Sequence, residues 1–140
     1  MRLIGAVGIL VALTGAVEAQ PLKVQQQKVR EEAGLAVEVV TLNKTCETQI
    51  TATFNWETVP EDKTDRASNF CNHALDGIER VCVDSLGKEA VRKQITEIKC
   101  SYAEQRSMSL SDGIFEFKSD FDYNTRDTRF IIFEYLQGKL

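Results

Sequence analysis

The chain has 140 residues, with 17 Lys and Arg against 21 Asp and Glu, and a formal net charge of −4 at pH 7. This length is typical of one domain. The acidic balance argues against a nucleic-acid partner, because phosphate binding depends on clustered lysines and arginines.

Residues 1–19 have the features of a cleavable signal peptide. Arg2 supplies one basic charge, Leu3–Leu13 is an uncharged apolar run, and small residues flank Glu18 just before Gln20. This order of segments is typical of a secretory signal with its cleavage site. The apolar run is shorter than the roughly 20 residues that a membrane span needs. We therefore expect a mature form without a membrane span, located in the periplasm or outside the cell.

The segment 20–34 is polar, with three consecutive glutamines at 25–27, and is expected to be a polar N-terminal arm or a frayed helix. A single α+β domain is expected at 35–140. Leu35, Val37 and Val39 occupy alternate positions, which predicts a short strand. The tripeptide 43–45 is an N-glycosylation sequon, relevant only in a eukaryotic source.

A strict alternation of apolar and polar residues follows at 50–57. Apolar Ile50, Ala52, Phe54 and Trp56 alternate with polar Thr51, Thr53, Asn55 and Glu57, which predicts a half-buried strand. Beyond Pro60, the residues Cys71, Leu75, Ile78 and Cys82 recur with helical spacing. Asp65 or Ser68 is expected to cap this helix, and Gly87 to end or interrupt it.

The four cysteines, Cys46, Cys71, Cys82 and Cys100, are expected to form two disulfides in an exported protein. Their spacing does not fit a zinc site. If Cys71 and Cys82 share a helix, about 16 Å separates them, which is too far for a disulfide. Pairing Cys46 with Cys82 and Cys71 with Cys100 is favoured over the other arrangement, because a helix that folds back along the strand brings Cys82 towards Cys46.

The C-terminal part is expected to complete the sheet. Ile98, Cys100 and Tyr102 alternate as a strand, and Asp112-Gly113 predicts a two-residue hairpin turn. That turn pairs Ser111 with Ile114, Leu110 with Phe115, Met108 with Phe117, and Ser109 and Ser107 with Glu116 and Lys118. Residues 130–136 fit a strand or a helix, and we favour a C-terminal helix with Phe130, Phe133 and Leu136 in the core.

No catalytic, metal or cofactor site is predicted. His73 lies two positions from Cys71, so on a helix the two side chains face different directions, and His73 is expected to be a surface residue. The first three ligand positions of an EF-hand loop are matched by Asp120, Asp122 and Asn124. Ile131, however, stands where the bidentate glutamate is required. Paired carboxylates for a hydrolase have candidates by residue type alone: Glu57, Asp76, Glu79, Glu97 and Asp112.

These observations predict an α+β fold in which an antiparallel sheet of about four strands packs on one main disulfide-tethered helix. The favoured function is a non-enzymatic module that binds a protein or an envelope component, and an inhibitor is one form that such a module takes. The alternative is a small secreted hydrolase that uses paired carboxylates. The predicted binding surface comprises Thr51, Thr53, Asn55 and Glu57 together with Asp120, Asp122 and Asn124.

Overall fold

The structure is a computed structural model that describes residues 20–122 and 128–140. The predicted signal peptide and Asn124 lie outside the described residues. The elements in chain order are α1 (Leu22–Cys46), β1 (Thr51–Asn55), two short 3₁₀ helices (Trp56–Thr58 and Glu61–Arg66), α2 (Ala67–Val81), α3 (Ser85–Gln94), β2 (Glu97–Tyr102), β3 (Ser107–Ser111), β4 (Ile114–Ser119) and α4 (Thr128–Gln137).

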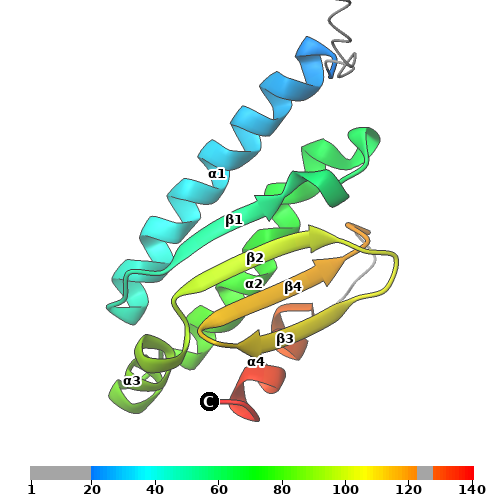
Figure 1. The fold of residues 1–140 in the computed structure, drawn as a ribbon. Helices are drawn as coiled ribbons and strands as arrows, with labels where there is room; N and C mark the ends of the chain where they lie inside the picture. The colour runs from blue at the N-terminus through cyan, green and yellow to red at the C-terminus, as the bar shows by residue number, and fades with distance from the viewer. Residues whose placement is uncertain (1–19, 123–127) are drawn as a thin grey trace, which may run out of the picture.

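The four strands form one mixed sheet in the order β1-β2-β4-β3. The prediction of an α+β fold with about four strands is confirmed, but the prediction of an antiparallel sheet is wrong. Strands β1, β2 and β4 are parallel, and only β3 runs against its neighbour β4. The chain returns from β1 to β2 through α2 and α3, and such a helical crossover makes neighbouring strands parallel. Figure 1 shows α2 and α4 behind the sheet and α1 beside β1, with no described helix on the opposite face.

The hairpin of β3 and β4 has the predicted register. Ser111 pairs with Ile114, Leu110 with Phe115 and Met108 with Phe117. Its turn residues Asp112 and Gly113 have φ values of 54° and 80°. A two-residue turn with two left-handed residues matches the twist of the strands that it joins, which explains why this sequence fixes the register.

Helix α1 corrects two predictions. Of the two alternatives for 20–34, the arm is wrong and the helix holds from residue 22, and the short strand at 35–40 is wrong because the same helix of 25 residues continues through it. Glu31, Leu35, Leu42 and Cys46 are its buried residues and lie on one face. The alternation of Leu35, Val37 and Val39 therefore does not reflect a strand: Leu35 is buried and Val37 is exposed on the opposite side.

Helix α2 is the disulfide-tethered helix of the prediction. Disulfides join Cys46 to Cys82 and Cys71 to Cys100, as favoured from the sequence. The predicted capping residue is wrong, because the helix begins at Ala67 after Arg66, with no side-chain cap of its own. Instead, the buried carboxylate of Glu31 on α1 accepts a hydrogen bond from the backbone N–H of Ser68 at 2.9 Å. A carboxylate at a helix N-terminus satisfies a free N–H group and interacts favourably with the helix dipole.

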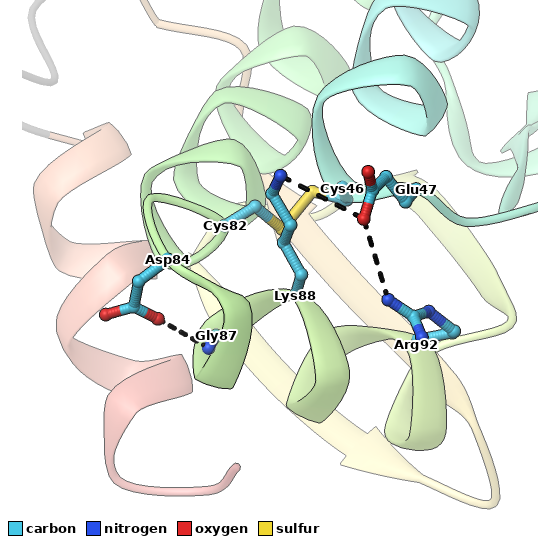
Figure 2. Close-up of polar contacts among 7 residues, drawn as sticks. All are labelled: Cys46, Glu47, Cys82, Asp84, Gly87, Lys88 and Arg92. Atoms are coloured by element: carbon cyan, nitrogen blue, oxygen red, sulfur yellow. Dashed lines mark hydrogen bonds and ion pairs between the residues drawn. A yellow bond between two sulfur atoms is a disulfide. The ribbon is translucent and has the colours of Figure 1, made fainter.

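The chain breaks after α2 and starts a new helix before Gly87. Asp84 caps α3 by accepting a hydrogen bond from the N–H of Gly87 at 2.7 Å. Figure 2 shows this cap beside the Cys46–Cys82 disulfide, with Glu47 pointing towards Lys88 and Arg92. The two ion pairs of Glu47 measure 4.0 and 3.9 Å, and Glu47 itself is exposed to solvent, so they add little stability. The disulfide therefore fixes this corner, where the ends of α1 and α2 meet.

The predicted C-terminal helix is confirmed as α4, which packs against α2. Leu136 lies in the core as expected and Phe133 is half-buried, but Phe130 is 47% exposed, so its assignment to the core is wrong. Most of the core lies between the sheet and the helices, and its largest buried side chains include Phe115, Phe117, Leu42, Leu75, Ile78, Ile98 and Ile132. In the described ranges, no helix is long and apolar enough to cross a bilayer.

Candidate functional site

The uncovered face of the sheet is polar from one edge to the other. The register places Thr53, Lys99, Glu116 and Ser109 in one row across the four strands. The predicted residues Thr51, Thr53 and Asn55 are all exposed on this face. Their neighbours on the inner face, Ala52 and Phe54, pack against the core. The alternation in β1 thus separates a core side from an accessible polar side, as the sequence predicts.

The second predicted group lies at one end of the sheet. Because β1, β2 and β4 are parallel, the residues that follow β1 and β4 lie at the same end, which brings exposed Glu57 and the residues Asp120 and Asp122 to that end. Lys63 Nζ donates a hydrogen bond to the Asp120 carbonyl at 3.3 Å. The backbone N–H of Asp122 donates to Asp120 Oδ1 at 3.0 Å. Backbone hydrogen bonds of this segment therefore help to hold Asp120 and Asp122 in place.

A groove that the sequence did not predict runs beside β1. Its volume is about 330 Å³, and it is lined by Glu32, Leu35 and Ala36 of α1 and by Ala52, Thr53 and Phe54 of β1. Thr53 points to the open face of the sheet, whereas Ala52 and Phe54 point to the helices. A hollow that touches all three must follow the edge of the strand. The groove therefore lies between α1 and the outer edge of β1, which have adjacent positions in Figure 1.

Trp56 lies just beyond the C-terminal end of β1 and connects it to α1. Its Nε1 donates a hydrogen bond to Glu32 Oε1 at 2.8 Å, and Lys28 Nζ lies 5.5 Å from the ring centroid. The ring also contacts Phe54, with 4.7 Å between centroids. These contacts fix the position of α1 relative to β1, so the groove between them has a defined width.

A different hollow contains two of the carboxylates considered for hydrolysis. Asp76 and Glu79 line a space of about 400 Å³ together with Thr45, Arg80, Val83 and Arg129. Burial, and then the neighbouring carboxylates of Asp76 and Glu38, raise the pKa of Glu79. Asp76 forms an ion pair with Arg129 at 3.1 Å. The hollow therefore combines Glu79, whose carboxyl group has a raised pKa, with Asp76, whose carboxylate is paired with Arg129.

His73 lies one turn before Asp76 on α2. Burial, followed by the charge of Arg129, lowers the pKa of His73, and Asp76 partly opposes this effect. The ring packs edge-on against Phe70, with centroids 5.5 Å apart, and its buried Nδ1 has no hydrogen-bond partner among the described residues. The sequence-based reading of His73 as a surface residue is therefore incomplete, because half-buried His73 contributes to packing.

No group of three or more histidine, cysteine or acidic side chains within 20–122 and 128–140 is arranged to hold a metal ion. No protein family, no curated protein and no solved structure matches this chain.

Proposed function

We propose that this chain is an exported, disulfide-stabilised, non-enzymatic module that binds a protein or an envelope component through β1. The observation that carries the proposal is the accessibility of β1 on two sides. The open face presents Thr51, Thr53 and Asn55, and the edge forms one wall of the groove with α1. The export of the protein is supported by its two disulfides, since disulfides persist mainly in oxidising compartments.

The scaffold around this surface is suited to binding without conformational change. Both disulfides are buried and attach α2 to α1 and to β2. Trp56 and Glu32 hold α1 beside β1. A surface that is already ordered loses less conformational entropy on binding, which favours affinity. The fixed geometry therefore supports recognition rather than a role as a flexible linker.

Affinity capture from envelope and extracellular extracts tests the proposal. The bait is the oxidised full-length protein, and the reduced and alkylated protein is the control. Thr53→Arg places a bulky charge beside the groove, whereas Ser109→Arg makes the same change in the same row at the opposite edge strand. The proposal predicts a partner that binds the oxidised wild-type and Ser109→Arg proteins but not Thr53→Arg. Equal capture by all three oxidised proteins, or no capture at all, would reject β1 as the binding surface.

The hollow at Asp76 and Glu79 favours a second candidate function, a hydrolase that uses a carboxyl pair. An acid with a raised pKa beside a second carboxylate is the arrangement that general acid catalysis requires. A panel of fluorogenic glycosides tests this candidate, with Glu79→Gln and with Glu104→Gln as a control at an exposed acid. Turnover that is lost only in Glu79→Gln would establish catalysis, and no turnover by the wild-type protein on any glycoside would reject this form of it.

A further inference from the structure

The backbone of β1 has unused hydrogen-bonding groups along its outer edge. The N–H of Thr51 donates to the carbonyl of Thr96 at 3.2 Å, on the side of β2. Because alternate residues of a strand bond to opposite sides, Thr53 and Asn55 also bond to β2, whereas Ala52 and Phe54 point away from it. Because β1 is an edge strand, the outward N–H and C=O groups of Ala52 and Phe54 have no partner in the sheet, and no other hydrogen bond to them is found among the described residues.

Ile50, the residue just before β1, has a hydrogen-bond partner for its outward backbone groups. The side-chain amide of Asn43 accepts a hydrogen bond from the N–H of Ile50 at 2.8 Å and donates one to the carbonyl of Ile50 at 2.9 Å. An amide side chain has the same donor and acceptor as a peptide unit, so Asn43 occupies the place of one residue of a neighbouring strand. The outer edge is therefore paired at Ile50 and open at the next two outward positions. The same contacts engage the nitrogen that a sugar would modify in the sequon.

The groove lies where a neighbouring strand would run. Leu35 and Ala36 of α1 form an apolar wall opposite Ala52 and Phe54, and Glu32 is the only charged residue among the six that line it. Its volume of about 330 Å³ is at the lower end of the range of about 300–1,000 Å³ for ligand sites, which suits a few residues of an extended chain. Strand β1 also lacks the charged residues and prolines that usually protect an exposed edge from pairing.

We propose that this edge binds an extended peptide, which adds to the sheet as a fifth strand in the groove between α1 and β1. Backbone hydrogen bonds from Ala52 and Phe54 supply affinity, and alternate peptide side chains contact Leu35 and Ala36. A basic peptide residue pairs with Glu32, whose second carboxylate oxygen has no partner among residues 20–122 and 128–140 after Oε1 has bonded to Trp56. This inference rests on the proposed binding function and specifies the partner as a segment with alternating apolar residues and a lysine or arginine.

Panning a displayed library of random decapeptides against the oxidised full-length protein tests this inference. Affinities of the enriched peptides are then measured by fluorescence anisotropy. Ala52→Pro removes one outward N–H at an edge position where proline is tolerated, and Ala52→Ser keeps that N–H. Ala36→Leu fills the groove, whereas Ala33→Leu adds the same side chain at another exposed position of α1. Thermal melting identifies any variant that does not fold, and the Ala36 and Ala33 pair decides the result if Ala52→Pro is unfolded.

We expect Ala52→Pro and Ala36→Leu each to lower peptide affinity about fivefold or more, and both control variants to change it less than about twofold. Failure to enrich any peptide, or peptides that bind all variants equally, would overturn the inference. A captured partner that is sensitive to Thr53→Arg but insensitive to Ala52→Pro and Ala36→Leu would leave the proposed function intact and reject only the strand-addition mode.

Discussion

Two glycines in neighbouring helices are expected to respond in opposite directions to the same substitution. Gly34 lies inside α1, and Gly77 lies inside α2 where that helix packs against α4. Alanine is favoured over glycine by about 1 kcal/mol in a helix interior. The sign of each effect therefore depends on the space available for one methyl group.

At Gly34 the space is sufficient. An added Cβ would meet only Ser68, at 3.8 Å, which is ordinary van der Waals contact. Gly34→Ala should therefore stabilise the protein by about 0.5–1 kcal/mol. At Gly77 an added Cβ would clash with the Cγ2 methyl group of Ile132, and it would lie 2.8 Å from Ile132 Cβ and 3.3 Å from the carbonyl of Arg129. Overpacking costs about 1–3 kcal/mol and outweighs the helix preference, so Gly77→Ala should destabilise by about 1–2 kcal/mol.

Thermal unfolding followed by circular dichroism measures both effects on the oxidised protein. At about 4 °C per kcal/mol, the melting temperature should rise by about 2–4 °C in Gly34→Ala and fall by about 4–8 °C in Gly77→Ala. A double-mutant cycle with Ile132→Ala should show favourable coupling with Gly77→Ala, since it removes the methyl group that clashes. An unchanged or lower melting temperature in Gly34→Ala would contradict a continuous helix through Gly34. Stabilisation by Gly77→Ala would contradict the close packing of α2 on α4.

Three further predictions concern the cap, the histidine and a disulfide. Glu31→Ala should lower the unfolding free energy by about 2–3 kcal/mol in a urea titration, because Ser68 loses its buried acceptor, and Glu31→Gln should recover part of this loss. Because the pKa of His73 is lowered in the folded protein, the unfolded state binds the proton more readily. The free energy of unfolding should therefore fall as the pH drops below about 6.5 towards the folded pKa. Thermal melts at several pH values should show a flatter pH dependence for His73→Phe. Replacing Cys71 and Cys100 by serine opens a loop with a sequence separation of 29 and should cost about 3–4 kcal/mol, measured by the same titration; an unchanged midpoint would contradict a stabilising bridge.

The parts of the fold that the sequence predicts are those that depend on local chemistry. The Asp112-Gly113 turn determines the register of its hairpin through two left-handed residues. The pairing of the cysteines follows from the distance between Cys71 and Cys82 along α2 and from the direction in which that helix returns. The turn and the exclusion of a Cys71–Cys82 bridge are constraints within short segments, whereas the choice between the two remaining pairings depends on how the helix packs along the strand.

The full extent of helix α1 was not predicted, because two local patterns compete in it. Its first half is polar, Gly34 is a poor helix former near its middle, and Leu35 and Val39 also fit an alternating strand. The same stretch contains Leu35, Val39, Leu42 and Cys46 at positions i, i+4, i+7 and i+11, which is the spacing that identified α2. That signal, extended back to Glu31, would have located the helix.

The parallel pairing of β1, β2 and β4, and the groove, depend on tertiary structure. The sequence does not show that β4 inserts between β2 and β3. The exposed residues of β1 were predicted correctly, because alternation identifies the two faces of a strand. The groove was not predicted, because its second wall is α1, whose position beside β1 depends on tertiary structure. Its open backbone groups also leave no mark in the sequence, since every residue type except proline carries the same N–H and C=O groups.

Amide hydrogen exchange of β1, resolved by NMR, tests the open edge most directly. In the free protein, the amides of Ala52 and Phe54 should exchange at least about tenfold faster than those of Thr53 and Asn55, which bond to β2. Addition of an enriched peptide should slow the exchange of Ala52 and Phe54 and leave their neighbours unchanged. Equal protection of all four amides in the free protein would show that the edge is already occupied and would contradict strand addition at β1.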